Sequence, residues 1–396
     1  MLENPNEKEW GFGGYVTEDG AYLVVGVSKS TEEKYLVVYQ DLARGGAMQT
    51  LIGQFEADYT YVANDGPVFY FKTTAGAPRG RVIAIDLRKP DRSAWREIVA
   101  EAPGVETLTQ VSVVGETLFA VYLADARSVV RRYQLDGRAQ GELTLPGIGT
   151  ASGFGGGRAD TETFYSFSGF TTPTTIYRYD LATGLSTVYK QPSVDFDPSQ
   201  YETKQVFYPS KDGTLVPMFI SHKKGILLDG SNPTYLYGYG GFNISLTPSF
   251  SVSAICFMEQ GGVYAVANLR GGGEYGEQWH RAGTKERKQN VFDDFCAAAQ
   301  WLVKERYTSS THLGIGGGSN GGLLVGAVMT QRPELFAACI PEVGVMDMLR
   351  FHKFTIGWAW TDDYGCADEE KDFHVLRAYS PLHNLKPGTR LSLIHI

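Results

Sequence analysis

Short runs of apolar and aromatic residues alternate with polar turns along the first half of the chain. Turn residues such as Asn64-Asp65-Gly66 and Asp136-Gly137 separate the runs. This alternation predicts β-strands throughout residues 1–192, in sets of about four strands every 40 to 50 residues. Such spacing is typical of the blades of a β-propeller, although the pattern alone leaves a β-sandwich as an alternative. The expected strands include Tyr22–Val27, Tyr35–Tyr39, Tyr59–Val62, Val68–Phe71, Val82–Ile85, Leu118–Tyr122, Phe164–Phe167 and Ile176–Tyr179.

The pattern changes after about residue 192, where strands begin to alternate with helices. This order predicts an α/β domain built on a mostly parallel sheet. We therefore expect a β-propeller domain at residues 1–192 and an α/β domain at residues 193–396, with a linker near Gln191-Pro192-Ser193. The expected elements of the second domain are a hairpin of Tyr201–Tyr208 and Leu215–Ile220, buried strands at Thr234–Tyr237 and Val263–Ala267, and a helix from Phe292 to Glu305.

A glycine-rich segment, Gly316–Gly322, contains the pattern G-x-S-x-G around Ser319. It follows the apolar segment His312–Ile315 and precedes the apolar segment Leu323–Met329, so that strand, tight turn and helix are expected in that order. This is the context of a nucleophile elbow, in which the serine adopts a strained backbone and flanking glycines prevent clashes. We therefore interpret Ser319 as a catalytic nucleophile, with the backbone N–H of Asn320 as one donor to an oxyanion.

Composition and charge exclude several classes of function. The 396 residues are 43% hydrophobic and 20% charged, with a formal net charge of −8, which argues against nucleic acid or an anionic membrane surface as a partner. No apolar run approaches the roughly 20 residues that a membrane span needs. The four cysteines form no close pair, so we expect buried thiols and a cytoplasmic protein.

No pattern predicts a cofactor or a metal ion. Gly271-Gly272-Gly273 lacks both the lysine-serine pair of a phosphate loop and a complete dinucleotide fingerprint, so we expect a structural loop near the active site. Asp293-Asp294 is expected at the start of a helix, where acidic side chains are favourable without any ion.

Several segments of the second half resemble the prolyl oligopeptidase family of serine peptidases. The likeness is nearly continuous from about residue 200 to 390 and looser in the first half. The segments are Tyr237–Ile244, Asn268–Gly276, Gln289–Phe295, the elbow, Gly344–Met348, Trp360–Cys366 and Tyr379–Asn384. The resemblance implies a seven-bladed propeller beside an α/β-hydrolase domain. It also implies hydrolysis of short peptides on the carboxyl side of proline through an acyl-enzyme.

The resemblance also assigns site residues. It gives the second oxyanion donor as the hydroxyl of Tyr239, and the glycines beside Tyr239 are typical of a loop that approaches a ligand closely. It places Phe242, Val345, Trp360 and Tyr364 in the pocket for proline, whose rigid ring packs well on aromatic faces. We expect a monomer that takes short proline-containing peptides and needs no cofactor or metal.

The likeness ends near Arg390, before the catalytic aspartate and histidine of the family. We therefore expect that the chain is a fragment truncated at both ends, that it lacks this acid and base, and that it is inactive by itself. Of the histidines after Ser319, we expect His352 and His383 to be structural, and His395 lies in a tail that does not resemble the family. The alternatives are a non-catalytic scaffold and a related oligopeptidase that prefers another residue before the cleaved bond.

Overall fold

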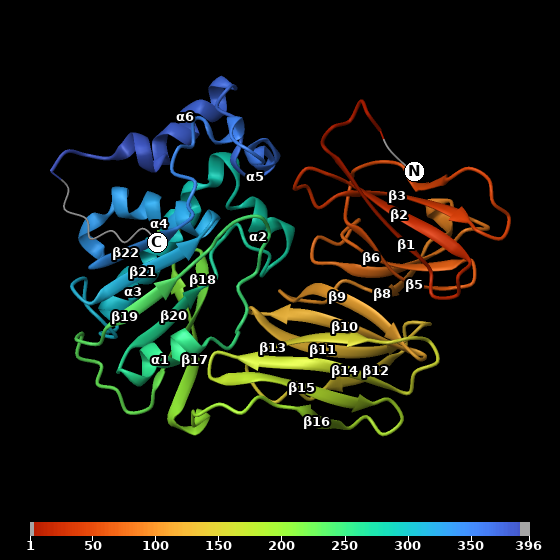
Figure 1. The fold of residues 1–396 in the computed structure, drawn as a ribbon, viewed down its shortest axis with the longest axis horizontal. Helices are drawn as coiled ribbons and strands as arrows, with labels where there is room; N and C mark the ends of the chain where they lie inside the picture. The colour runs from red at the N-terminus through yellow and green to blue at the C-terminus, as the bar shows by residue number, and fades with distance from the viewer. Residues whose placement is uncertain (1–3, 389–396) are drawn as a thin grey trace. The chain divides into compact units, whose positions relative to one another are not determined.

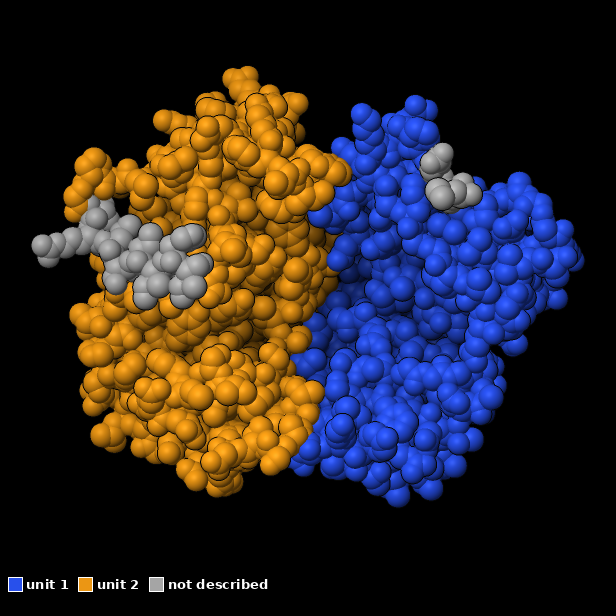
Figure 2. All heavy atoms as spheres, in the orientation of Figure 1, with its two compact units in different colours: residues 1–167, 175–191 blue, residues 168–174, 192–396 orange. Residues whose placement is uncertain are grey.

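The structure, a computed structural model, describes residues 4–388. The chain forms two compact units (Figure 2). The first unit consists of Met1–Phe167 and Thr175–Gln191, and the second of Ser168–Thr174 and Pro192–Ile396. In the described part of the chain, no helix is both long and apolar enough to cross a membrane.

The first unit consists of four four-stranded sheets in which strands consecutive in the chain are neighbours. Separate hydrophobic cores fill the spaces between the first and second, the second and third, and the third and fourth sheets. Successive sheets therefore pack face to face like the blades of a propeller, as the spacing of the strands predicts, and the two-sheet sandwich is excluded. The strands are β1 (Trp10–Val16), β2 (Tyr22–Lys29), β3 (Tyr35–Asp41), β4 (Gln49–Ile52), β5 (Tyr59–Asp65), β6 (Val68–Thr73), β7 (Arg81–Asp86), β8 (Arg96–Val99), β9 (Thr107–Val114), β10 (Thr117–Ala124), β11 (Arg127–Gln134), β12 (Ala139–Leu143), β13 (Thr150–Gly155), β14 (Glu162–Gly169), β15 (Thr172–Asp180) and β16 (Ser186–Lys190).

The second unit is built on a six-stranded sheet in the order β17-β18-β20-β19-β21-β22 (Figure 1). The β17–β18 and β18–β20 pairs are antiparallel, whereas β20, β19, β21 and β22 run parallel. The predicted hairpin and both predicted strands are confirmed. The strands are β17 (Tyr201–Pro209), β18 (Leu215–Lys223), β19 (Thr234–Tyr237), β20 (Val263–Ala267), β21 (Leu313–Gly318) and β22 (Ala338–Glu342).

Helices cover both faces of this sheet. Along β20, Val263, Ala265 and Ala267 belong to the main core with α3 and α4, whereas Tyr264 packs into the small cluster beneath α1. Since alternate residues of a strand point to opposite faces, α1 lies on one face and α3 and α4 on the other. The predicted helix is confirmed as α3, which begins at Gln289 and not at Phe292. The helices are α1 (Val252–Glu259), α2 (Glu277–Arg281), α3 (Gln289–Lys304), α4 (Asn320–Gln331), α5 (Thr361–Tyr364) and α6 (Glu370–Tyr379).

The cysteines differ in part from the expectation. All four are free thiols, but only Cys296 and Cys339 are buried. Cys256 is exposed and Cys366 is half-buried. The prediction of four buried thiols is therefore wrong for Cys256, which lies on the short helix α1 at the surface.

Candidate active site

Ser319 lies on the turn between β21 and α4. The strands β19, β21 and β22 are parallel neighbours, so their carboxyl ends meet at one edge of the sheet, where ligands of such sheets bind. Ser319 has φ 56° and ψ −116°, which is the strained backbone that the pattern predicts. Its N–H donates to the carbonyl oxygen of Glu342 at 2.9 Å. The residue is exposed, so its hydroxyl is open to a ligand.

The loop after β19 passes beside this serine. Tyr239 is half-buried, and burial raises the pKa of its hydroxyl, whereas a hydrogen-bonding interaction with the Ser319 side chain lowers it. The two hydroxyls therefore lie next to each other. The loop is strained at Phe242 and Asn243, which are not glycines and have φ values of 55° and 54°, whereas Gly240 adopts its φ of 67° without strain.

Asn320 contacts this loop from the first turn of α4. Its side-chain Nδ2 donates to the carbonyl oxygen of Tyr239, and its Oδ1 accepts from the Tyr364 hydroxyl at 2.9 Å. The backbone N–H of Asn320 belongs to the first residue of the helix, where N–H groups have no acceptor within the helix. The elbow thus brings Ser319, the Asn320 N–H and the Tyr239 hydroxyl to one place.

A buried lysine lies behind the loop. Lys288 directly precedes α3 and is 1% exposed. Its Nζ donates to the carbonyl oxygen of Gly240 at 2.9 Å and to Asn320 Oδ1 at 3.0 Å, and it lies 5.2 Å from the centre of the Tyr364 ring. Burial lowers the pKa of Lys288 to about 8, against the attraction of Asp363. The ammonium therefore remains mostly protonated at neutral pH.

A buried aspartate contacts the loop two residues further along, at Phe242. Asp363 on α5 is 2% exposed, and its Oδ2 accepts from the N–H of Phe242 at 3.1 Å. Its Oδ1 pairs with His280 Nε2 at 2.7 Å. Burial favours the neutral acid, but His280 and Lys288 outweigh burial and lower the pKa of Asp363. This carboxyl is therefore ionised.

The four apolar residues assigned to the pocket differ in exposure. Phe242, Val345 and Trp360 are half-buried against the main core. Tyr364 is only 1% exposed, and the Phe242 ring meets it edge-on at 5.3 Å. Phe242, Val345 and Trp360 therefore keep accessible surface. Tyr364 is buried, and it contacts Phe242 through its ring and Asn320 through its hydroxyl.

The histidines of the described residues contact groups other than Ser319. His352 pairs with Asp368 at 3.1 Å, His383 with the Ser380 hydroxyl at 2.8 Å, and His374 lies beside Phe373. His395 lies outside the described residues. The hydrogen bonds of His222, His280 and His312 go to Lys223, Asp363 and Ser309.

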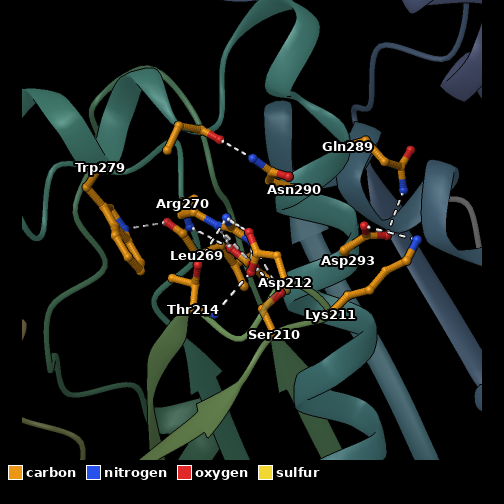
Figure 3. A network of polar contacts seen from close by, with 12 residues as sticks. Ser210, Lys211, Asp212, Thr214, Leu269, Arg270, Trp279, Gln289, Asn290 and Asp293 are labelled. Carbon is orange, nitrogen blue, oxygen red and sulfur yellow. Dashed lines mark hydrogen bonds and ion pairs between the residues drawn. The ribbon is translucent and has the colours of Figure 1, made fainter.

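A second charge cluster, formed by the buried Arg270 and Asp294 and the exposed Asp212, supports the glycine loop (Figure 3). Arg270 donates to Asp212 Oδ2 at 2.6 Å from Nη1 and to Asp294 Oδ2 at 3.0 Å from Nε. Burial disfavours the charge on Arg270, but the hydrogen bonds to both aspartates prevail and raise its pKa. The same bonds lower the pKa of Asp212 to about 2. The carbonyl oxygen of the next residue, Gly271, accepts from the N–H of Asn243 at 3.1 Å. By fixing Arg270, the cluster therefore also fixes a backbone group that binds the strained loop.

This cluster corrects the interpretation of Asp293-Asp294. The pair does not begin the helix, because α3 starts at Gln289. Asp294 is fully buried against Arg270, and Asp293 lies 3.5 Å from the Lys211 ammonium. The two carboxylates therefore form ion pairs with Arg270 and Lys211, which are distant in the sequence and cannot be identified from a local pattern.

One group of described side chains has the composition of a metal site. Ligand atoms of His352, Cys366 and Asp368 lie within 4.8 Å of one another. However, Asp368 already pairs with His352 and with the Lys353 ammonium, each at 3.1 Å. Asp368 therefore already has two partners within the chain.

Sequence analysis missed His280, Lys288 and Asp363. Their contacts join residues that lie 32 to 121 positions apart in the chain. One signal was available, because Lys288 places a positive charge at the positive end of a helix, where a cation is unfavourable.

Comparison with family models matches both halves of the chain. Residues 1–192 match the N-terminal β-propeller domain of prolyl oligopeptidase, and residues 248–395 match the prolyl oligopeptidase family. Among curated proteins, the prolyl endopeptidase of Elizabethkingia miricola is 47% identical over 95% of this chain and 53% of its own length. The prolyl endopeptidase of Dictyostelium discoideum is 39% identical over 97% of this chain and 53% of its own length.

Solved structures agree. A chain from a structural and mechanistic study of two prolyl endopeptidases is 44% identical with a TM-score of 0.95, over 99% of this chain and 58% of that one. Prolyl oligopeptidase B from Galerina marginata, bound to a 35mer hydrolysis and macrocyclization substrate, is 37% identical with a TM-score of 0.95, over 100% of this chain and 57% of that one. The chain spans about half the length of the curated relatives it matches.

Proposed function

The chain belongs to the prolyl oligopeptidase family, and from that premise we propose that the protein is a serine endopeptidase that cleaves short peptides on the carboxyl side of proline. The observation that carries the proposal is the elbow: an exposed, strained Ser319 next to the Tyr239 hydroxyl and the Asn320 N–H. Ser319 attacks the peptide carbonyl, and both donors stabilise the negative charge that develops on its oxygen.

The proposal divides the chain into a propeller domain, residues 1–192, and a hydrolase domain, residues 193–396. We propose that the half-buried Phe242, Val345 and Trp360 line the proline pocket and that the buried Tyr364 packs behind Phe242, since a rigid ring without an N–H gains most from flat apolar walls. Four unpaired cysteines support a reducing, cytoplasmic location, and we propose a monomer.

A preference for basic residues before the cleaved bond is the second candidate, and the charges next to the pocket disfavour it. Asp362 pairs with Arg281 and Lys285 at 3.4 Å and 3.3 Å, and Asp363 pairs with His280. The carboxylates beside Trp360 and Tyr364 therefore already have partners within this chain: Asp362 has two cations, and Asp363 has a hydrogen bond with His280 and the attraction of the Lys288 ammonium.

The test is labelling by a fluorophosphonate probe, combined with hydrolysis of chromogenic peptides that end in proline or in arginine. The protein is expressed from its complete gene, because hydrolysis also requires a histidine base and an orienting acid. We expect labelling and proline-specific cleavage, both abolished in Ser319→Ala and retained in the control Ser253→Ala, which changes an exposed serine on α1. Absence of labelling in the unmodified protein would support the scaffold alternative, and preferential cleavage after arginine would support the second candidate.

A further inference from the structure

We propose that Lys288 and Asp363 are positioning residues that hold the Tyr239–Phe242 loop in its strained, donor-presenting conformation. The inference rests on the proposed function and deepens it, because it names groups that act on the reaction through Tyr239 and Asn320. Neither side chain belongs to the nucleophile, the oxyanion donors or the proline pocket.

The loop needs external support. Gly240, Phe242 and Asn243 all have positive φ values, of 67°, 55° and 54°. A non-glycine residue in such a conformation costs about 1–3 kcal/mol and persists only where its surroundings enforce it. Two non-glycine residues in sequence therefore require strong contacts to the peptide groups around them.

Lys288 and Asp363 supply these contacts with opposite charges. The ammonium of Lys288 binds the carbonyl oxygen of Gly240, whereas the carboxylate of Asp363 binds the N–H of Phe242. Hydrogen bonds of charged groups are roughly twice as strong as neutral ones. Since the two contacts flank Gly241, they fix the direction of the chain directly after Tyr239.

Lys288 also connects the two oxyanion donors. One ammonium binds Gly240, next to Tyr239, and the Oδ1 of Asn320. The same Nζ lies 5.2 Å from the centre of the Tyr364 ring, whose hydroxyl donates to the same Oδ1. The elbow and the Tyr239 loop come from different strands, and Lys288 bridges them in addition to the direct hydrogen bond from Asn320 Nδ2 to the carbonyl oxygen of Tyr239.

Stability alone does not explain these charges. Removing an ion from water costs several kcal/mol, and apolar side chains of similar size often stabilise a core as well or better. Both side chains are nevertheless at least 98% buried, with exposed fractions of 1% and 2%. Two buried charges that destabilise the fold but fix the backbone beside the oxyanion donors are consistent with a positioning role.

The test compares Lys288→Met with the control Lys304→Met, an exposed lysine at the other end of α3, in protein expressed from the complete gene. Loss of an oxyanion donor lowers kcat by about 10²–10³-fold, and we expect a misplaced donor to lower it by about 10- to 100-fold. KM is expected to change less than kcat, because Lys288 contacts the loop at Gly240, next to the oxyanion donor, and reaches the pocket residues only through the buried Tyr364. Lys304→Met is expected to retain the full rate.

A double-mutant cycle separates positioning from a merely structural effect. If Lys288 acts through Tyr239, then Lys288→Met lowers kcat/KM much less in a Tyr239→Phe background than in the unmodified enzyme. Binding of a peptide aldehyde, which forms an oxyanion with Ser319, is expected to weaken with kcat/KM. Binding of the same peptide without its aldehyde is expected to weaken less.

The outcomes are distinguishable. Should the unmodified protein neither label nor cleave, the proposed function fails. The positioning role is refuted if the protein cleaves and Lys288→Met retains the full kcat. It is also refuted if Lys288→Met lowers kcat/KM by the same factor in the Tyr239→Phe background as in the unmodified enzyme. Where Lys288→Met does not melt cooperatively, Lys288→Gln replaces it, since its amide can still donate to one oxygen, and an intermediate loss of kcat is expected; full activity in that variant would equally refute the proposal.

Discussion

Glu274 is a buried carboxyl whose ionisation opposes folding. It is 1% exposed, and its Oε1 accepts from the Leu246 N–H at 2.9 Å and from Asn268 Nδ2 at 3.2 Å. Burial nevertheless raises the pKa of Glu274 from 4.5 to about 7. The folded state therefore binds this proton more tightly than the unfolded state, and the free energy of unfolding falls as pH rises from about 4.5 to about 7.

Glu274→Gln is expected to remove this cost. At pH 8 the variant should be more stable by on the order of 3 kcal/mol, because each tenfold change in proton affinity corresponds to about 1.4 kcal/mol. Below pH 4.5 the two proteins should be nearly equal, because protonated Glu and Gln have the same shape and charge. Urea denaturation at both pH values measures the difference, with the exposed Glu277→Gln as the control for loss of a carboxylate. A gain that is as large at pH 4 as at pH 8 would contradict the assignment.

At the scale of single residues, the sequence was informative where local geometry decides the chemistry. Ser319 could be singled out because a nucleophile elbow needs glycines at fixed positions beside the serine. Lys288 and Asp363 could not, because their partners are backbone groups 48 and 121 positions away. Those contacts form only when two loops and the start of a helix meet at one edge of the sheet.

The elbow itself depends on close approach of backbone to backbone. A Cβ built on Gly321 would lie 2.7 Å from the carbonyl oxygen of Gly238, and one on Gly317 would lie 2.5 Å from the carbonyl oxygen of Gly321. At Gly318, by contrast, the nearest atom is Glu342 Oε2 at 3.7 Å. Gly317 and Gly321, the two glycines of the G-x-S-x-G pattern, therefore have no room for a side chain, whereas Gly318 has room for a Cβ.

Gly321→Ala is accordingly expected to destabilise the protein by about 1–3 kcal/mol, because α4 or the Tyr239 loop must shift to relieve the overlap. Labelling of Ser319 by a fluorophosphonate should slow as well. The matched variant Gly318→Ala should change stability by no more than about 0.5 kcal/mol. Thermal melting of the two variants gives the comparison. If both variants lose the same stability, close backbone contact does not explain why the pattern has glycine at position 321.

At the scale of elements, the sequence predicted strands better than boundaries or partners. Aromatic and β-branched runs identified the blade strands, because such residues favour a pleated, half-buried surface. The start of α3 was placed at Phe292 instead of Gln289, because the helix begins with two polar residues, Gln289 and Asn290, and the apolar periodicity was counted from Phe292 although Val291 is also buried. The pairing of Asp294 with Arg270 was missed for the same reason as the Lys288 contacts, since it links separate elements.

At the scale of the whole molecule, the two units differ in how they bury apolar surface. The second unit has one large core between its sheet and helices, whereas the first has a separate core between each pair of successive sheets. Chain length and the change of pattern near residue 192 predict two domains, whereas the second compact unit also includes Ser168–Thr174. The pattern does not show which side chains fill each core. A unit with its own core can unfold separately from its neighbour.

Two matched substitutions test whether the units unfold separately. Phe119 packs against Phe154 and Tyr179 in the first unit, and Phe292 packs against Tyr379 in the second; both are fully buried. Replacement of either by Ala should cost about 3–5 kcal/mol, through lost burial and the cavity that remains. In calorimetry we expect two transitions, with Phe119→Ala lowering the Tm of one and Phe292→Ala lowering the Tm of the other. If instead both variants shift a single common transition, the free energy that couples the units exceeds the stability of the weaker core, and the two cores act as one cooperative structure.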